Sequence, residues 1–334
     1  MKTTALRLYG KNDLRLDEFE LPLMNEDEII GEIVTDSLCM STYKATSQGV
    51  NHKKVPNDIN KNPIIVGHEF CGKILKVGKK WENKYNEGDK FVIQPNLGVA
   101  GGLAPGYSYR YMGGDATKIV IPNVVMENNC LLSYTGETYF EGSLVEPMSC
   151  VIGAFNANYH TKSSGYEHEM GVRKRGTMAL LGATGPMGFL AIDFALHGPI
   201  KPEFLVVTGR TEGKLDLVRN LYTQEEARKQ GVTLKYVNTN DMKDDIDYLR
   251  GLTKDDYGFD DVFVFAPVKK LVETSAAILA YDGCLNFFAG PQDKDFSTKF
   301  NFYNIHYNSI HVVGTSGGNV ADMKQALILI ENKT

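Results

Sequence analysis

The sequence predicts an α/β protein with two domains, one a doubly wound parallel sheet and the other mostly β and barrel-like. The chain has 334 residues, more than one ordinary hydrophobic core organises. Up to about residue 150, short β-type runs are separated by Gly, Pro and Asn, whereas from residue 177 apolar runs alternate with helix-length segments. The first pattern is typical of an antiparallel barrel, and the second of a parallel sheet with helices on its faces.

The first half contains four clear strand runs, each bounded by turn-forming residues. They read EIIGEIVTDS, PIIVGHEFCGKILKVG, DKFVIQPN and ATKIVIPN, and begin at residues 28, 63, 89 and 116. Such spacing indicates a mostly antiparallel domain up to about residue 150.

Six apolar runs form the expected parallel sheet of the second half. They read TMALLG, EFLVVTG, TLKYVN, DDVFVFA, GCLNFFAG and SIHVVGTS, and begin at residues 177, 203, 233, 260, 283 and 309. The stretch YHTKSSGYEHEMGVRKRG, at 159–176, is polar and contains glycine, so we interpret it as a surface connection.

Composition limits the classes of partner. Thirty-six basic against 41 acidic residues give a net charge of −5 without a basic block, which argues against nucleic acid and anionic membranes and favours small molecules. Five cysteines with no C-x-x-C pair indicate a reducing compartment. The N-terminal residues lack a signal core, and no run approaches the ~20 apolar residues of a membrane span. We therefore expect a cytoplasmic protein.

A glycine loop stands between the first strand of the parallel sheet and an apolar helix. In MALLGATGPMGFLAIDFAL the glycines are Gly182, Gly185 and Gly188, and the residues between the last two are Pro186 and Met187. Glycines at such a turn let the backbone approach a pyrophosphate, and the helix N-terminus favours its charge. This position predicts a dinucleotide site that also includes Thr184, although a purely structural turn remains the alternative.

The end of the next strand bears on the choice of nicotinamide cofactor. An NAD site usually has an acidic residue there, on the ribose hydroxyls. This chain has Gly209 and Arg210, and Arg210 with Thr208 and Lys214 suits a 2′-phosphate. We therefore favour NADP(H) over NAD(H), with a loop-capping role for Arg210 as the alternative.

Four side chains from separate segments form a candidate catalytic zinc site. Cys39, His68, Glu69 and Glu146 supply the thiolate, imidazole and carboxylate ligands that such sites use. A buried structural cysteine, a strand-end histidine and surface carboxylates are the alternatives. Two further groups of side chains carry no ligand spacing, so we expect core thiols and ordinary histidines; they are Cys71, Cys130 and Cys284, and His52, His160, His168, His197, His306 and His311.

Taken together, these segments resemble the medium-chain dehydrogenase/reductase superfamily, and within it the zinc-dependent polyol branch that includes sorbitol dehydrogenases. The resemblance covers nearly the whole chain and is carried by Cys39 with Ser41, by GHEFCG, KKWENKYNEGDKF and VEPMSC, and by the glycine loop. It implies a GroES-like catalytic domain at 1–155 and a Rossmann domain at 156–314. At 315–334 it implies the start of a segment that returns to the catalytic domain, the rest of which we expect to be missing.

The same resemblance implies roles for individual residues. Cys39, His68 and Glu69 match the catalytic zinc ligands, and Glu146 matches the glutamate that touches the zinc or its water. Cys150, one helical turn after Glu146, is a second candidate for that position. Ser41 matches the hydroxyl that begins the proton relay.

Three departures from the branch carry expectations of their own. Residues 94–114 contain no cysteine where many relatives hold a structural zinc, so one zinc is expected. Thr42 replaces an aspartate that supports the metal site, so this support should come from elsewhere. The segment VVGTSGGNV replaces a sugar-binding arginine with small residues, which leaves room for an anionic substrate.

A closer resemblance, to reductases of ketose phosphates, is carried by TTALRLYGKNDLRL, NHKKVP, YFEGSLVEPMSCVIGAFNANYH and DGCLNFFAGPQDK. It implies reversible reduction of L-sorbose 1-phosphate to D-glucitol 6-phosphate with NADPH, in a homodimer or homotetramer. Candidate cations for the phosphate are Lys44, Lys53, Lys54 and Arg110. The alternatives are a dehydrogenase of an unphosphorylated polyol or secondary alcohol, a metal-free NADPH quinone reductase, and a catalytically silent NADPH-binding protein.

Overall fold

The computed structural model describes residues 1–162, 165–240, 242 and 244–333. The chain divides into two compact units, of which unit 1 comprises Met1–Ser149 with Gly318–Thr334 and unit 2 comprises Cys150–Gly317. The sequence had placed these divisions after residues 155 and 314. The first division falls inside helix α4 (Val145–Ala157), whose apolar sequence continues without a break that could mark a boundary.

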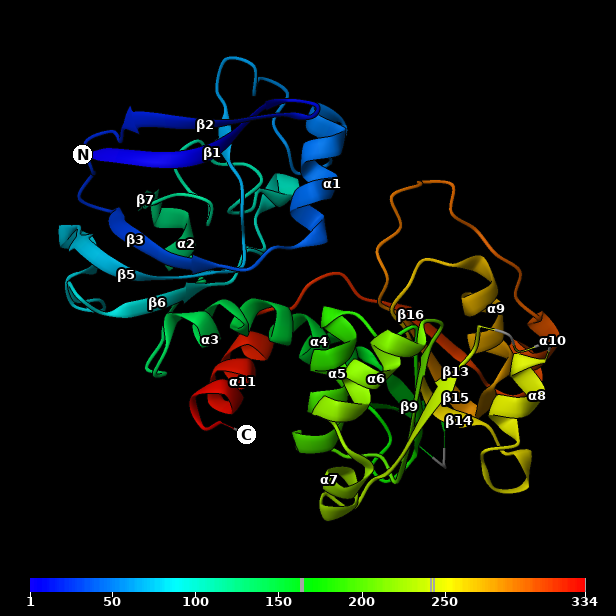
Figure 1. Ribbon diagram of the computed structural model, residues 1–334. Helices are drawn as coiled ribbons and strands as arrows, with labels where there is room; N and C mark the ends of the chain where they lie inside the picture. The colour runs from blue at the N-terminus through cyan, green and yellow to red at the C-terminus, as the bar shows by residue number, and fades with distance from the viewer. Residues whose placement is uncertain (163–164, 241, 243, 334) are drawn as a thin grey trace. The chain divides into compact units, whose positions relative to one another are not determined.

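Unit 1 is built on two antiparallel sheets (Figure 1). The smaller has the strand order β2-β1-β4, and the larger has the order β7-β3-β5-β6-β8. The strands are β1 (Lys2–Gly10), β2 (Asp13–Glu20), β3 (Ile29–Asp36), β4 (Ile64–Ile65), β5 (Phe70–Val77), β6 (Lys90–Ile93), β7 (Lys118–Ile121) and β8 (Leu131–Ser133). The helices are α1 (Met40–Gln48), α2 (Asn123–Glu127), α3 (Tyr139–Ser143) and α11 (Val320–Glu331), with 3-10 turns η1 (Gly49–Asn51), η2 (Lys79–Trp81) and η3 (Ala100–Gly102).

Two apolar clusters fill unit 1. The larger contains Phe70 and Phe91, whose rings meet edge to face with centroids 6.4 Å apart. The smaller contains Ala45 of α1, Val66 just after β4, and Tyr107 of the segment 94–114. This smaller cluster therefore holds together the three segments that carry the candidate site.

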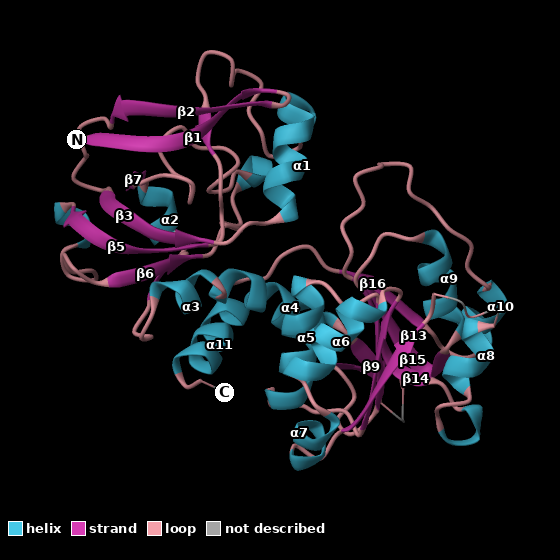
Figure 2. Ribbon diagram, in the orientation of Figure 1, coloured by secondary structure: helices cyan, strands magenta, loops and turns pink. Residues whose placement is uncertain are grey.

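Unit 2 is a doubly wound parallel sheet with the strand order β13-β12-β11-β14-β15-β16. Its strands are β11 (Thr177–Leu181), β12 (Phe204–Gly209), β13 (Thr233–Asn238), β14 (Phe259–Val264), β15 (Leu279–Phe287) and β16 (His311–Gly314). Its helices are α5 (Pro186–His197), α6 (Glu212–Leu221), α7 (Gln224–Lys229), α8 (Asp245–Arg250), α9 (Lys269–Ala277) and α10 (Phe302–Tyr307), with the turn η4 (Lys254–Asp256). Helices α5 and α6 cover one face, and α8 and α9 the other (Figure 2). The predicted α/β fold class is confirmed.

The stretch 159–176 is more than the surface connection that its polarity suggested. It forms a hairpin of β9 (Tyr159–Thr161) and β10 (His168–Met170). His160 is only 5% exposed and lies 3.2 Å from a carboxylate oxygen of Asp261. A buried ion-pairing partner makes this polar histidine part of the core, which its polar sequence surroundings did not indicate.

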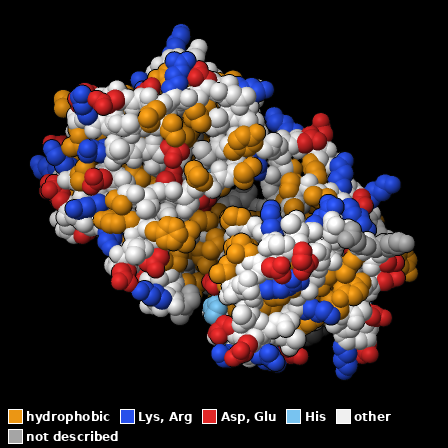
Figure 3. Space-filling view, viewed as in Figure 1, with side chains coloured by type: hydrophobic (Ala, Val, Ile, Leu, Met, Phe, Trp, Pro, Cys, Tyr) orange, Lys and Arg blue, Asp and Glu red, His pale blue; other side chains and the backbone are white. Residues whose placement is uncertain are grey.

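Charged side chains of both signs are interspersed over the visible surface (Figure 3). Among the described residues, no helix has both the length and the apolar content needed to cross a bilayer.

Candidate metal centre and cofactor loop

Three of the four predicted metal ligands lie together in unit 1. Cys39, His68 and Glu69 each offer one ligand atom, and these atoms lie within 4.8 Å of one another. His68 and Glu69 are buried, and Cys39 is half-buried. Within the described part of the chain, no other group of three histidine, cysteine or acidic side chains approaches as closely.

The start of helix α1 and the turn before strand β5 carry these ligands. Cys39 is the N-cap of α1, and its Sγ accepts a hydrogen bond from the Ser41 N–H over 3.4 Å. His68 and Glu69 occupy the turn between β4 and β5. At that turn the Glu69 N–H donates to the Asp36 carboxylate, and the Glu69 carbonyl accepts from the Ser37 N–H, each over 3.0 Å. The end of β3 thereby fixes the turn.

Both ring nitrogens of His68 have partners. The Thr42 hydroxyl lies 3.4 Å from Nδ1, so the residue that replaces the branch's aspartate is itself the outer partner of the imidazole. This corrects the expectation that support would come from elsewhere. The Tyr107 hydroxyl lies 3.1 Å from Nε2.

Tyr107 is the residue of the site that sequence reasoning missed. It belongs to the segment 94–114, which in this chain delivers a buried phenol, only 4% exposed, to the candidate ligands. The preceding Gly106 makes this approach possible, because a Cβ there would lie 2.0 Å from the Gly67 carbonyl oxygen. Gly106 also has φ +74°, a left-handed conformation that favours glycine.

Burial sets the protonation of the group. It lowers the pKa of His68 to about 3, with a further contribution from the Lys54 charge. Burial raises the pKa of Cys39 to about 12, and the Glu69 charge contributes to this rise. Burial also raises the pKa of Glu69 to about 6. At neutral pH the imidazole is therefore uncharged, which is the form that binds a metal ion.

Glu146, Ser41 and Cys150 lie outside the group of three. Glu146 is buried in the first turn of α4. Burial and the Cys39 charge have the largest raising effects on the pKa of the Tyr107 phenol, and the Glu146 charge raises this pKa further. The Ser41 side chain lies near enough to Tyr107 to lower the pKa of its phenol, against the larger effect of burial. Cys150 is half-buried and forms no disulfide with another described residue.

The donor set fits zinc. One sulfur, one imidazole nitrogen and one carboxylate oxygen are ligand types that Zn²⁺ takes in catalytic sites, where three protein ligands leave a position for substrate or water. Their burial limits competition from bulk solvent. Cys39, His68 and Glu69 are therefore the residues that would hold the ion.

The glycine loop of unit 2 has the form of a phosphate cradle. Helix α5 begins at Pro186, and its N-cap Gly185 supplies no side-chain hydrogen bond, which leaves the first-turn N–H groups for a ligand. Gly188 packs so closely that a Cβ would lie 2.1 Å from the Ala183 carbonyl oxygen. Thr184 and Met187 are half-buried in the same loop.

Two of the predicted cofactor residues at the end of β12 have different surroundings. The Thr208 hydroxyl accepts a hydrogen bond from the Gly182 N–H over 3.1 Å and is buried, so it shapes the glycine loop. Arg210 is exposed, and within the described residues no hydrogen bond or ion pair involves its guanidinium. At Gly209 a Cβ would lie 2.5 Å from Thr184 Cγ2, which excludes an acidic side chain there.

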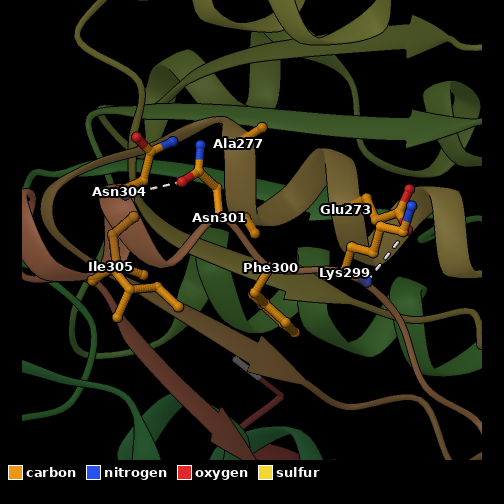
Figure 4. Close-up of a pocket in the computed structure, with 9 residues that line it drawn as sticks. Glu273, Ala277, Lys299, Phe300, Asn301, Asn304 and Ile305 are labelled. Atoms are coloured by element: carbon orange, nitrogen blue, oxygen red, sulfur yellow. Dashed lines mark hydrogen bonds between the residues drawn. The ribbon is translucent and has the colours of Figure 1, made fainter.

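A separate pocket of about 330 Å³ lies in unit 2 between α9, the segment 299–301 and α10 (Figure 4). Glu273 on its wall accepts a hydrogen bond from the Thr298 hydroxyl over 2.6 Å. None of the predicted site residues lines this pocket.

Comparison with known proteins decides the family. Two family models match, one described as an alcohol dehydrogenase GroES-like domain at residues 25–155 and the other as a zinc-binding dehydrogenase at residues 186–332. The L-sorbose 1-phosphate reductase of Klebsiella pneumoniae is 54% identical over 333 residues, which are 99% of this chain and 79% of that protein. The chain belongs to the zinc-binding dehydrogenases. It is thus an oxidoreductase of the zinc-type alcohol and polyol dehydrogenase class, as the sequence predicted.

Other zinc-type dehydrogenases are also similar to this chain. The mannitol-1-phosphate 5-dehydrogenase of Aliivibrio fischeri is 48% identical over 328 residues, 98% of this chain and 77% of that protein. A zinc-binding dehydrogenase from Sinorhizobium meliloti bound to NADP superposes with a TM-score of 0.78 at 17% identity, covering 100% of this chain and 89% of that chain. The 2R,3R-butanediol dehydrogenase from Bacillus subtilis gives 0.77 at 18% identity, with 99% and 88% covered. At these low identities the structural matches show the fold.

Proposed function

We propose that the chain is a zinc-dependent reductase of ketose phosphates that converts L-sorbose 1-phosphate to D-glucitol 6-phosphate with NADPH, reversibly. The observation that carries this proposal is the 54% identity, over 99% of the chain, to a protein named for that activity. The gathering of Cys39, His68 and Glu69 supports it, because a ketone reductase of this family needs such a donor set.

The proposed chemistry assigns a role to each residue of the site. Zinc held by Cys39, His68 and Glu69 supplies a Lewis acid for the ketone oxygen, and NADPH supplies the hydride. The Ser41 hydroxyl is proposed to give its Oγ proton toward the alkoxide oxygen that hydride addition would leave, with the Tyr107 phenol nearby to orient it. Glu146 is proposed to position water or to exchange with it at the metal.

One zinc per chain is part of this proposal, as is NADP(H) in preference to NAD(H). The group of three ligands supports a single ion. The exposed Arg210 supports the choice of cofactor, because its guanidinium can form a paired contact with a 2′-phosphate, and Gly209 leaves no space for the carboxylate of an NAD site.

Self-association and a cytoplasmic location complete the proposal. Strand β16 is the last in its sheet, and its Val312 is 46% exposed. The neighbouring α10 exposes Phe302, Tyr303 and Tyr307, which supports burial against a second copy. The five cysteines include no C-x-x-C pair, which supports a reducing compartment.

A second candidate substrate is a hexitol phosphate with a different configuration, favoured by the 48% identity to a mannitol-1-phosphate 5-dehydrogenase. An unphosphorylated polyol remains the other alternative, supported by a sorbitol dehydrogenase of Bombyx mori that is 28% identical over 264 residues, 69% of this chain and 66% of that protein. The three substrates differ in the presence and position of the phosphate, which makes them separable in one assay.

The test is NADPH oxidation by zinc-loaded protein with L-sorbose 1-phosphate, D-fructose 6-phosphate and L-sorbose, next to the zinc content. We expect the highest kcat/KM with L-sorbose 1-phosphate and about one zinc per chain. A higher value for D-fructose 6-phosphate would favour the second candidate, and a higher value for free L-sorbose the third. Turnover by protein that holds no metal would refute the zinc-dependent mechanism.

A further inference from the structure

Three groups lie close to the phenol ring of Tyr107. The His68 imidazole lies 4.8 Å from its centroid, the Lys54 ammonium lies 5.0 Å from it, and the His52 ring stacks on it at 5.6 Å with an interplanar angle of 9°. A lysine cation and a candidate metal ligand therefore lie close to the same aromatic ring.

The backbone of Lys54 is fixed on both sides. Its N–H donates to Nδ1 of His52 over 3.3 Å, and its carbonyl oxygen accepts from the Ser108 hydroxyl over 2.7 Å. Ser108 follows Tyr107 in the chain, so the run NHKKVP is held against the segment that delivers the phenol. The lysine side chain thus leaves from a defined position.

Other positive charges gather at the same place. Burial has the largest effect on the pKa of His52 and lowers it. The charges of Lys54, Lys53 and Lys44 lower this pKa further. Lys53 and Lys54 are consecutive in the chain and follow His52 directly.

We propose that Lys54 supplies the cation that binds the phosphate of the substrate. This inference rests on the proposed function, since it assumes a ketose phosphate whose ketone lies at Cys39, His68 and Glu69. In L-sorbose 1-phosphate the phosphate is carried by the carbon next to the ketone, so its cation must stand close to the metal ligands. Lys54 meets this requirement because it lies close to the same ring as His68, and lysine is a usual point-charge partner of phosphate.

Arg110 is the matched cation that does not meet the requirement. It is exposed in the same segment 94–114, and its guanidinium lies 5.2 Å from the ring centroid of Tyr111. Tyr111 packs against Phe19, whereas Tyr107 packs against His68. Arg110 therefore shares the segment and the cation–π contact of Lys54 without its proximity to the ligands.

The test compares Lys54→Gln, Lys54→Arg and Arg110→Gln with the wild type, all as full chains loaded with zinc and checked by zinc content and Tm. We expect Lys54→Gln to lower the ratio of kcat/KM for L-sorbose 1-phosphate over that for L-sorbose about ten- to hundredfold, the range for a charged hydrogen bond. Lys54→Arg should recover part of this ratio, and Arg110→Gln should keep it. Inorganic phosphate should compete with the ester, with a Ki that rises in Lys54→Gln.

The possible outcomes distinguish a failure of the proposed phosphate subsite from a failure of the proposed function. If the wild type prefers the ester and Lys54→Gln keeps the same preference, the subsite is wrong and the proposed function stands. A rise in KM for NADPH alone would assign Lys54 to the cofactor and overturn the subsite. If the wild type shows no preference for the ester, both proposals fail. Should Lys54→Gln not fold, Lys54→Arg and phosphate competition in the wild type decide, and lack of competition overturns the subsite.

Discussion

The Tyr107 hydroxyl lies 3.1 Å from Nε2 of His68, although 38 residues separate the two in the chain. This contact places a phenol beside a proposed metal ligand, and the Ser41 side chain also acts on the phenol. We expect Tyr107→Phe to lower kcat about tenfold through the loss of one oriented hydrogen bond, while the zinc content stays near one per chain. Steady-state kinetics and elemental analysis measure both.

Tyr109→Phe is the control for this prediction, because Tyr109 is a half-buried phenol of the same segment that packs against the larger core cluster. Equal losses of kcat in the two variants would show that Tyr107 has no particular role at the site.

Cys39 and Cys150 provide a direct comparison of two thiols. Cys39 belongs to the group of three ligand atoms, whereas Cys150 does not. We expect Cys39→Ala to remove zinc and turnover together, and Cys150→Ser to keep both, because a site with two remaining ligands binds the ion far more weakly. Elemental analysis after dialysis decides, and a full zinc complement in Cys39→Ala would disprove the ligand assignment.

Gly106 is a backbone requirement of the site. Gly106→Ala combines a left-handed backbone with a Cβ 2.0 Å from the Gly67 carbonyl, so the segment 94–114 has to move away from the turn of His68. We expect the free energy of unfolding to fall by more than the ~1–2 kcal/mol that a left-handed alanine costs by itself, and zinc binding to weaken.

Gly98→Ala is its matched control, because Gly98 also has a left-handed φ, +66°, but its Cβ would meet nothing within 4 Å. Urea unfolding of both variants measures the difference. The same loss of stability in the two would mean that the close approach at Gly106 contributes nothing.

Arg210 should discriminate between the two nicotinamide cofactors. Removal of its guanidinium in Arg210→Ala should raise KM for NADPH about tenfold or more and change KM for NADH little, because only NADPH carries the 2′-phosphate. Arg175→Ala serves as the control, since Arg175 is an exposed arginine of the same unit that pairs with Glu203 over 2.9 Å. A parallel rise for both cofactors would contradict the role of Arg210 in selectivity.

The stability of unit 2 should depend on pH through two buried groups. Burial opposes ionisation of Asp282, but hydrogen bonds from Thr161 and His311 outweigh it and lower the pKa of its carboxyl. Burial also disfavours the charged form of His160, but its contacts with Asp261 outweigh this and raise its pKa. Asp282 therefore stabilises the fold above its unfolded pKa, about 3.9, and this is lost as the pH falls through the lower folded value. His160 contributes fully below about 6.5, and this contribution is lost as the pH rises through its raised pKa.

We thus expect a stability maximum for unit 2 between about pH 4 and 6.5 from these two groups. Thermal unfolding across pH measures it, and Asp282→Asn should flatten the acid side. Asparagine tolerates the left-handed backbone at Asp282, φ +59°, so the substitution changes the charge with little strain. An unchanged acid side, or the same flattening in the exposed control Asp293→Asn, would refute the assignment to Asp282.

The sequence predicted the parts of this protein that local pattern specifies. All six parallel strands of unit 2 overlap the predicted apolar runs. The central strands β11, β12 and β14 are buried on both faces and are therefore mostly apolar. The first hairpin was not recognised, since β2 is largely exposed and its Leu16, 72% exposed, gives no alternating pattern of burial.

The candidate ligands could be named from their chemistry, but their surroundings could not. Cys39, His68 and Glu69 have distinctive side chains, whereas the contacts of Tyr107 and Asp36 depend on how distant segments pack. The glycine-rich run before Tyr107 was the available signal, because glycines in a loop often mark a close approach of backbone. His52 was expected to be an ordinary histidine, because its contacts also depend on how distant segments pack. In the structure its ring stacks on the Tyr107 phenol.

Unit 1 is assembled from two separate stretches of chain, and this has a consequence during synthesis. Val320 of α11 packs against its larger core cluster, and the Asn319 carbonyl accepts a hydrogen bond from the Gln94 side chain over 3.1 Å. The ribosome delivers these residues only after all of unit 2 has been made. A nascent chain therefore carries an N-terminal unit with uncovered apolar surface while the later unit is still being translated, which is the interval in which chaperones would be needed most.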